Sequence, residues 1–323
     1  MTAKGVTATH VTAMGGHRKE RCHVASRRLA AVAAGYFLDR ALGEPPASAH
    51  PVRAFGALMS ALEKHVYRDR RVYGAAYCAT GMAIAAATGL GVPSVALAVL
   101  VAIGGRALED AANGVARAID AADLNLARER VRALVGRDPQ HLDEPELVRA
   151  VVESVAENTN DAVVAPLVLA LVGGALGAYC YRAANTLDSM VGYRNPRYLR
   201  FGWASARLDD AASFLPARVT ALLVAAVRPA RARQVMRAVR RDARLHPSPN
   251  AGVAEAAFAA ALGLRLGGTN AYGGLVEHRP LLGSGRVPER ADIGRAVRLS
   301  RHVGTAAAGS LLVVASLLWW RGR

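Results

Sequence analysis

Apolar runs separated by charged stretches are the main feature of this chain. The segment Gly74–Gly105 contains no charged residue, and neither does Ala162–Ala178. Shorter apolar runs cover residues 29–38, 217–227 and 306–320. Because about 20 apolar residues cross a bilayer as a helix, we expect about four to six crossings or partial insertions. No stretch alternates with the two-residue period of a strand. The predicted fold is all-α, a polytopic integral membrane protein with amphipathic cytoplasmic and interfacial helices.

The run Gly74–Gly105 is longer than one crossing and shorter than two. Gly89, Gly91 and Pro93 interrupt it near the middle, and basic residues stand at both ends. Since positively charged loops remain in the cytoplasm, we expect a tight hairpin with both ends on that side. One long tilted helix is the alternative.

The run Ala162–Ala178 has a polar cluster at each end, and a single crossing would separate the two clusters. Pro166 and the pair Gly173-Gly174 interrupt this run. We therefore expect that the run re-enters the membrane, or else that one cluster lies in a membrane-facing cavity.

The flanking segments set the expected domain organisation. Residues 1–23 are small and polar, and we expect a disordered tail, followed by a single membrane-embedded helical domain over residues 24–323. Residues 27–49 imitate a signal peptide with a cleavage site, but a short first membrane helix fits better because the apolar run ends in Asp39-Arg40. Residues 108–152 combine many charges with the helical period, which predicts a cytoplasmic helical insert.

Composition supports the membrane interpretation. Mean hydropathy is +0.17, and the formal net charge is +16, from 41 basic and 25 acidic residues. The basic residues flank apolar runs instead of forming one stripe with aromatic residues, which favours cytoplasmic loops over nucleic-acid binding. We interpret the arginines of residues 228–244 as a face that contacts anionic lipid headgroups. The three cysteines form no CxxC pair, which favours a reducing compartment.

Two polar clusters flank Ala162–Ala178 and are the candidates for chemistry. The first comprises Glu153, Glu157, Asn158 and Asp161. Its three acids recur every fourth residue, so they share one helical face and repel one another unless a cation or a basic substrate lies between them. The second cluster comprises Asn185, Asp188, Arg194, Arg207, Asp209, Asp210 and Arg218. Ordinary loop charge at a membrane surface is the alternative for each residue taken singly.

Carboxylates and arginines are the residue types that hold Mg²⁺ and phosphate groups. The chain contains neither the G-x-x-x-x-G-K-[ST] motif of P-loop ATPases nor the H-E-x-x-H motif of zinc proteases. Ser154 and Ser189 have no nearby histidine, so a serine nucleophile has little support.

An ordered set of motifs carries a family resemblance. The motifs are ESVAEN (153–158) followed by Asp161 and Pro166, NTLDSMVGY (185–193), ARLDD (206–210) and PAR (216–218). Together with residues 39–56, 136–138 and 246–268, they resemble the adenosylcobinamide-phosphate synthases of cobalamin biosynthesis, the CobD/CbiB family. Asn160 stands where this family leads us to expect a small hydroxyl residue, and Ala260 where we expect glycine. Neither departure removes a charged candidate.

The resemblance implies an ATP-dependent acid–amine ligase. Such an enzyme joins a propionate side chain of adenosylcobyric acid to (R)-1-amino-2-propanol phosphate, or to a related amino alcohol, and gives adenosylcobinamide phosphate. It implies Mg²⁺ and ATP, a corrinoid as substrate, and the lipid bilayer and other cobalamin-assembly membrane enzymes as partners, with no nucleic acid. The expected location is the cell (inner) membrane, with multiple passes and a cytoplasmic active site.

The clusters and the resemblance together give the candidate site. The catalytic candidates are Glu153, Glu157, Asp161, Asp188, Asp209 and Asp210. Four of them, Glu157, Asp161, Asp209 and Asp210, are the expected Mg²⁺ ligands. The substrate-binding candidates are Asn158, Asn185, Arg207, Arg218, His50, His246 and Asn250. Structural roles are the alternatives: acids and asparagines as helix caps, arginines as partners of the aspartates, and histidines as packing residues.

Two other classes of protein compete with the enzyme. A membrane transporter or channel would carry its acids at the bilayer midplane on broken helices, within a repeated half. A membrane-associated nucleic-acid or lipid-binding protein would use the arginines of residues 228–244, and its acids would be dispensable. The acids of this chain lie at the ends of apolar runs and no internal repeat is visible, so we favour the enzyme.

Overall fold

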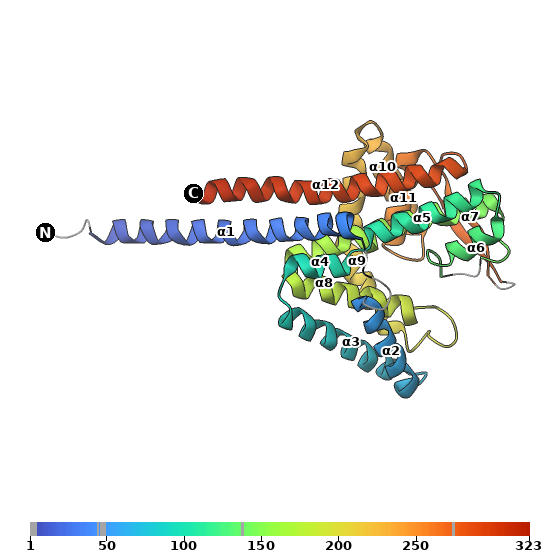
Figure 1. The fold of residues 1–323 in the computed structure, drawn as a ribbon, viewed down its shortest axis with the longest axis horizontal. Coiled ribbons are helices and arrows are strands. Elements are labelled where there is room, and N and C mark those ends of the chain that lie inside the picture. Colours follow the sequence, from blue (N-terminus) through green and yellow to red (C-terminus); the bar gives the residue numbers. More distant parts are fainter. Residues whose placement is uncertain (1–4, 44, 46–49, 137–138, 273–274) are drawn as a thin grey trace.

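The computed structural model describes residues 5–43, 45, 50–136, 139–272 and 275–323. The described chain is almost entirely helical (Figure 1). Its elements are α1 (Gly5–Leu42), α2 (Pro51–Val66), α3 (Arg71–Gly91), α4 (Val95–Ala102), α5 (Gly105–Asp120), α6 (Leu124–Val131), α7 (Glu144–Thr159), α8 (Ala165–Val191), α9 (Trp203–Val227), α10 (Ala232–Asp242), α11 (Ala251–Leu262), β1 (Leu266–Tyr272), β2 (Leu275–Leu282) and α12 (Arg290–Gly322).

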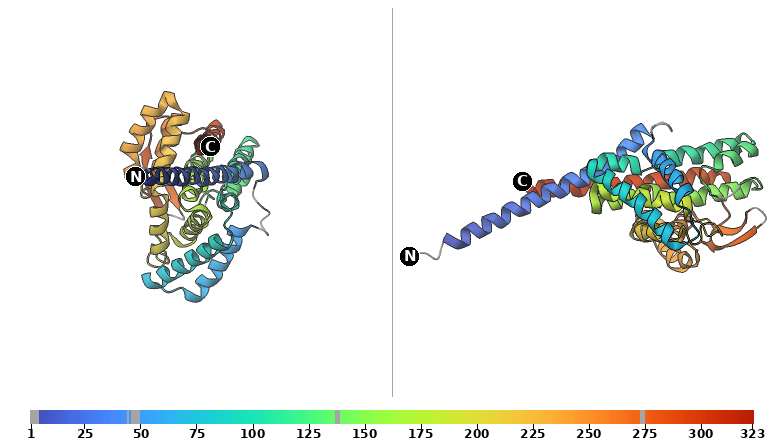
Figure 2. Two further views of the ribbon diagram at one scale, coloured as in Figure 1. Left: turned by 90° about the vertical axis from the view of Figure 1, so that its left-hand side faces the viewer. Right: turned by 90° about the horizontal axis from the view of Figure 1, so that it is seen from below.

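The first and last helices, α1 and α12, lie side by side and extend together away from the rest of the molecule (Figures 1 and 2). Ser26 of α1 donates a hydrogen bond to the carbonyl of Ala315, 2.8 Å away. Nearer the body of the molecule, the hydroxyl groups of Tyr36 and Thr305 lie 3.1 Å apart. Since the partners run in opposite sequence order, the two helices are antiparallel.

Helix α8 reverses its direction at Gly174. This glycine has φ 62° and ψ −143°, a conformation that residues with a Cβ strongly avoid. A Cβ on Gly177 would collide with the carbonyl of Leu169, although eight residues of uninterrupted helix would separate these positions by about 12 Å. The run Ala162–Ala178 therefore folds back on itself, as the re-entrant alternative predicts.

Helices α3 and α4 form a second reversal beside the first. At the start of α4, Ser94 caps the helix by accepting a hydrogen bond from the Leu97 amide, 3.4 Å away. The end of α3 packs at Gly89 against Leu176, next to the reversal of α8. Beyond the other end of α4, the Gly104 amide donates a hydrogen bond to the Ala162 carbonyl, 2.9 Å away. The apolar run 74–105 therefore forms two helices joined by a reversal, as the hairpin prediction has it, and not one long helix.

A π-helical turn, Asn160–Val164, joins α7 to α8. Such a turn inserts an extra residue into a helix and changes the direction in which its side chains point. Helix α9 packs against this turn and against both α8 and α11. The turn thereby lies at the junction of the four helices that form the candidate site.

The polar part of the molecule has its own hydrophobic core, built from α5, α6, α7, α9, α10, α11, α12 and the β-hairpin. Asp143 and Glu146 begin α7 with a capping box, in which each side chain accepts a hydrogen bond from the other residue's backbone amide. Strands β1 and β2 are antiparallel, with Gly268 opposite Arg279. Glu153 fixes the start of β1, because its carboxylate accepts a hydrogen bond from the Gly267 amide at 2.7 Å.

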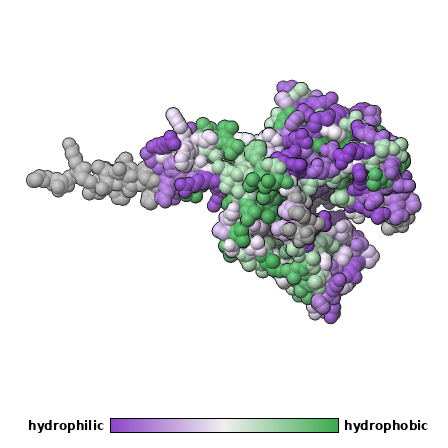
Figure 3. Space-filling view, viewed as in Figure 1, coloured by the Kyte–Doolittle hydropathy of each residue, from purple (hydrophilic) through white to green (hydrophobic). Residues whose placement is uncertain are grey.

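Apolar side chains gather on the surface over the middle of the molecule, whereas polar ones cover the part that holds α5, α6 and α10 (Figure 3). Three helices of the described chain are long and apolar enough to cross a membrane: Glu144–Val191, taken as one continuous helix, Trp203–Val227 and Arg290–Gly322. The expectation of about four to six insertions exceeds this count, because the apolar run 74–105 is divided into α3 and the eight-residue α4.

The all-α membrane fold is confirmed, with two corrections. The backbone from Gly5 onwards belongs to α1, so most of the segment expected to be a disordered tail is helical. The hairpin β1–β2 was not predicted, because its glycine-rich sequence does not alternate apolar and polar residues.

Candidate active site

An acidic pocket of about 270 Å³ lies where α7, the π-helical turn, α8, α9 and the loop before α11 meet. Five carboxylates line it: Glu157, Asp161, Asp188, Asp209 and Asp210. The other polar residues of its lining are Arg194, Arg279, His246, Ser248 and Asn250. All five carboxylates are half-buried, so they face a confined space rather than open solvent.

The reversal of α8 brings the two predicted clusters together. Asp161 lies 13 residues before Gly174, and Asp188 lies 14 residues after it. Two helical arms of nearly equal length therefore return the second cluster to the level of the first. Helix α9 then adds Asp209 and Asp210 from the opposite wall. The hypothesis that both clusters share one cleft is supported by this geometry.

Neighbouring amides hold two of the acids in place. Asn160 donates a hydrogen bond to Asp161 at 2.7 Å and accepts one from Thr220 of α9 at 3.1 Å. Asn185 lies with its amide nitrogen 3.4 Å from a carboxylate oxygen of Asp209. The residue that departs from the family pattern, Asn160, thus links α9 to a carboxylate of the pocket.

His246 lines the pocket from the loop before α11. Its Nδ1 accepts a hydrogen bond from the Ser248 amide at 3.1 Å, and its Nε2 lies 3.6 Å from the buried carboxylate of Glu255. Asn250 donates a hydrogen bond to the Asp210 carbonyl at 2.8 Å and accepts one from Arg218 at 2.9 Å. This loop is therefore tied to α9, and it carries the one histidine that lines the pocket.

Several predicted site residues lie outside the pocket lining. Glu153 binds the Gly267 amide, and Asn158 donates to the carbonyl of Ser154 within α7, at 2.9 Å. His50 caps α2 by accepting a hydrogen bond from the Val52 amide at 3.2 Å. Arg207 is exposed on α9. In the described chain Glu153, Asn158 and His50 thus make backbone contacts outside the pocket lining.

Two residues that the sequence interpretation missed take part in the lining. Arg279 comes from β2, and nothing in a strand of irregular polarity marked it as a site residue. Ser248 follows His246 in the Pro-rich loop, and its hydroxyl accepts hydrogen bonds from the amides of Asn250 and Ala251. Arg194 belonged to the second polar cluster but was not among the candidate site residues. Only the fold places Arg279 beside Glu157.

The chemistry of the pocket is that of oxygen ligands and positive charges. Carboxylates are the ligands that Mg²⁺ prefers, and Mg²⁺ usually takes one or two of them together with phosphate oxygens and water. Among the described residues, no group of three or more His, Cys, Asp or Glu side chains is arranged to hold a metal ion. The donor set suits an Mg²⁺ ion that arrives with a phosphorylated substrate, and Arg194 and Arg279 suit the phosphates themselves.

Fold and pocket together define a helical membrane protein with an acidic, arginine-flanked pocket on its polar side. A comparison with protein families makes this more specific, because the sequence model described as CobD/Cbib protein matches residues 32–300. The chain belongs to the CobD/CbiB family of cobalamin biosynthesis.

Individual relatives agree with the family. "Cobalamin biosynthesis protein CobD" of Mycobacterium tuberculosis (strain ATCC 25618 / H37Rv) is 46% identical over 311 residues, which cover 92% of this chain and 97% of the relative. The proteins of the same name from Rhodobacter capsulatus and Geobacter metallireducens are each 43% identical, over 87% and 82% of this chain and 95% and 90% of their own lengths. No solved structure matches the chain significantly.

Proposed function

We propose that this protein is an adenosylcobinamide-phosphate synthase. It joins a propionate carboxylate of adenosylcobyric acid to the amine of (R)-1-amino-2-propanol phosphate, or of a related amino alcohol, and consumes ATP. The observation that carries the proposal is the convergence of five carboxylates, two arginines and His246 on one pocket in a member of this family. Transport is the weaker alternative, because the relatives are named for biosynthesis.

The proposed reaction has two steps. A carboxylate oxygen of the corrinoid attacks the γ-phosphorus of ATP, so an acyl phosphate forms and ADP leaves. The amine nitrogen then attacks the acyl carbon, the bond from that carbon to the phosphate oxygen breaks, and inorganic phosphate leaves. Activation is needed because oxide is a poor leaving group, and phosphoryl transfer is catalysed mainly by positioning and by compensation of charge.

Each wall of the pocket has a proposed task. Arg194 and Arg279 bind phosphate oxygens of the substrates through paired hydrogen bonds. A carboxylate of the pocket, Asp188, takes a proton from the substrate ammonium group. His246, whose Nδ1 accepts from the Ser248 amide and whose Nε2 faces Glu255, holds the loop before α11 in place. One or two of the carboxylates Glu157, Asp161, Asp209 and Asp210 would hold Mg²⁺ together with phosphate oxygens of the substrate, and the bound ion would spread the negative charge of the transferring phosphate. Asp188 completes the acidic wall on α8.

We further propose that the pocket opens to the cytoplasm of a cell-membrane protein. The part of the chain around the pocket carries many arginines in loops and short helices, as cytoplasmic segments do. In this arrangement α12 crosses the membrane with α1 packed along it, while α3–α4 and α8 enter the membrane from the cytoplasmic side and return. Corrinoid and amino alcohol phosphate then reach the pocket from the cytoplasm, and other cobalamin-assembly enzymes have access to the same surface.

The test is an assay of the purified, detergent-solubilised protein with adenosylcobyric acid, ATP, Mg²⁺ and aminopropanol phosphate. The expected result is adenosylcobinamide phosphate, identified by its mass, with one ADP released per product. Amide formation without ATP, or ATP hydrolysis without any amide product at saturating substrates, would overturn the proposal. A protein that carries Asp209→Asn serves as the matched control, because it keeps the shape of the side chain and removes its charge.

A further inference from the structure

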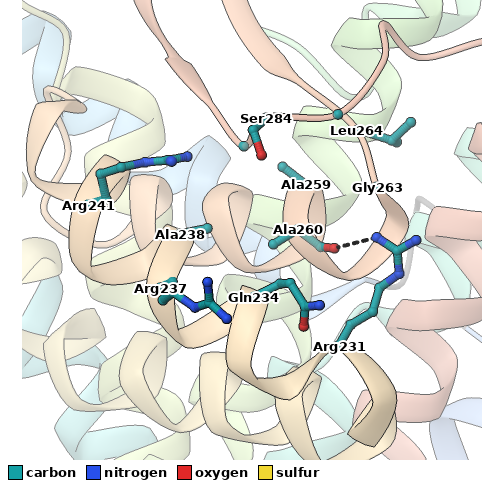
Figure 4. A pocket seen from close by; sticks show the side chains of 12 residues that line it. Arg231, Gln234, Arg237, Ala238, Arg241, Ala259, Ala260, Gly263, Leu264 and Ser284 are labelled. Carbon is teal, nitrogen blue, oxygen red and sulfur yellow. Dashed lines mark hydrogen bonds between the residues drawn. The ribbon is translucent and has the colours of Figure 1, made fainter.

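A second pocket, of about 350 Å³, differs from the acidic one in charge and in position. It lies between α10, the end of α11 and the loop after β2 (Figure 4). Ala259, Ala260 and Gly263 border it at the C-terminal end of α11, whereas the acidic pocket meets this helix at Asn250 and Ala251. About ten residues of helix, or roughly 15 Å, separate the two places. This basic pocket is therefore not part of the proposed catalytic pocket.

Three arginines border the basic pocket, and no acid does. They are Arg237 and Arg241, which with Gln234 project along one side of α10, and Arg231, which immediately precedes that helix. Arg231 donates to the carbonyl of Ala260 at 3.4 Å, and Arg241 is paired with the carboxylate of Asp242. Arg237 is exposed and makes no hydrogen bond or ion pair with the described residues. At least one guanidinium group is thus available to an anion.

The opposite wall is a fixed glycine-rich loop, Gly283-Ser284-Gly285. Gly283 has φ +81°, and its amide donates to the Asp242 carboxylate at 2.9 Å. The Gly285 amide donates to the Leu264 carbonyl at 3.2 Å, and a Cβ at this position would collide with the Gly263 carbonyl. The loop backbone comes this close to residues 263 and 264 only because Gly283 and Gly285 have no side chain. The loop holds the Ser284 hydroxyl toward the arginines (Figure 4).

The small side chains of Ala259, Ala260 and Gly263 leave the floor of the pocket open. Arg237 and Arg241 are one helical turn apart, about 6 Å along the axis, and Arg231 lies about 9 Å from Arg237 in the other direction. Because arginine side chains are long, guanidinium groups that start from successive turns on one side of a helix can reach neighbouring phosphate groups of one ligand. Arginine is also the residue type that binds phosphate through two parallel hydrogen bonds.

From these observations we propose that the basic pocket binds an anion with at least two linked phosphate groups, independently of the acidic pocket. Arg237 and Arg241 contact adjacent phosphates, and the hydroxyl and amide of Ser284 contact them from the other side. A soluble diphosphate and the headgroup of a lipid with two phosphates present the same chemistry to this pocket.

The experiment measures binding of inorganic diphosphate to the full-length, detergent-solubilised protein by calorimetry. Mg²⁺ is left out and the ionic strength is held constant, because surface charge is screened by salt. Arg237→Gln is expected to weaken binding about tenfold or more, as loss of one charge-assisted contact does. Arg240→Gln is the matched control, because Arg240 is exposed on the same helix but does not line the pocket. Its affinity is expected to equal that of the unaltered protein.

Other outcomes overturn the proposal. Equal weakening by Arg237→Gln and Arg240→Gln means that diphosphate senses only the general positive charge of α10, and unchanged affinity in Arg237→Gln means that it binds elsewhere. The measurement uses neither the catalytic substrates nor Mg²⁺, so failure of the catalytic proposal does not affect it. Bilayer discs that contain cardiolipin decide the source: competition with diphosphate identifies a lipid headgroup, and no competition identifies a soluble anion.

Discussion

At the scale of single residues, Glu153 and Glu157 show how two acids one turn apart in α7 come to differ. Glu157 lines the acidic pocket, whereas Glu153 is buried against the Gly267 amide. If Glu157 acts on charge that develops in the reaction, Glu157→Gln loses orders of magnitude in turnover, since each tenfold loss is about 1.4 kcal/mol of barrier. Turnover at saturating and at limiting Mg²⁺ is the measurement, and near-normal turnover at limiting Mg²⁺ would make this residue structural.

Glu153→Ala is expected to lower folding stability and to leave turnover unchanged. It leaves the buried Gly267 amide without its acceptor, which costs about 1–3 kcal/mol of folding stability. The midpoint temperature of thermal unfolding in detergent is therefore expected to fall, while the activity per folded molecule is expected to stay unchanged. A loss of turnover without a loss of stability would return Glu153 to the catalytic group.

Asp242 gives a prediction about pH. The hydrogen bonds from Arg241, followed by that from the Gly283 amide, lower the pKa of this carboxyl below its usual value. A group with a lowered pKa in the folded state stabilises the fold above its unfolded pKa of about 3.9, and this contribution is lost as pH falls through the folded value. The acid-induced loss of stability is expected to be smaller in Asp242→Asn. The difference between the two proteins is expected to be modest because Arg241 is exposed. If stability falls identically with pH in both proteins, the prediction is wrong.

At the scale of elements, the reversal of α8 depends on one glycine. Gly174→Ala forces a Cβ into φ 62°, ψ −143°, a backbone region that costs about 1–3 kcal/mol for residues other than glycine. We expect lower stability and lower activity, because Asp161 and Asp188 no longer meet in one pocket. Gly173→Ala is the control: no atom lies within 4 Å of its added Cβ, and alanine favours a helix. If the two substitutions lower stability and activity equally, the reversal of α8 does not depend on the backbone conformation of Gly174.

The sequence predicted the helices and their reversals better than it predicted which distant segments contact one another. Glycine and proline marked both reversals, and the four-residue spacing of the acids marked the site, because these signals are local. Arg279 was missed since it reaches Glu157 only through a hairpin more than 100 residues later. The arginines of α10 were interpreted as a lipid-facing surface, because the sequence does not show that a loop from residues 283–285 faces them. Contacts between distant segments depend on how the chain reverses, and periodicity carries no information about that.

At the scale of the whole molecule, the arrangement predicts which surfaces share a side of the membrane. In a protein whose native cysteines are replaced, Cys introduced at Glu129 and at Arg200, both exposed, should react with a membrane-impermeant thiol reagent from the same side. Cys introduced at Arg323 should react from the other side, because α12 carries the chain end away from the pocket (Figure 1). Labelling of positions 129 and 200 from opposite sides would contradict the re-entrant path of α8.

The pairing of α1 with α12 has a consequence for how the protein is made. Ser26 and Ala315 are 289 positions apart, and Tyr36 and Thr305 are 269 apart. A ribosome adds about 5–20 residues per second, so α1 emerges many seconds before its partner exists. During that interval Arg40 and Glu109, which lie on α1 and α5, have each other but not Arg301. Because of the order of synthesis, the contacts of α1 with α12 form after its contacts with α5, and a nascent chain that stops before α12 leaves the hydroxyl groups of Ser26 and Tyr36 without their α12 partners.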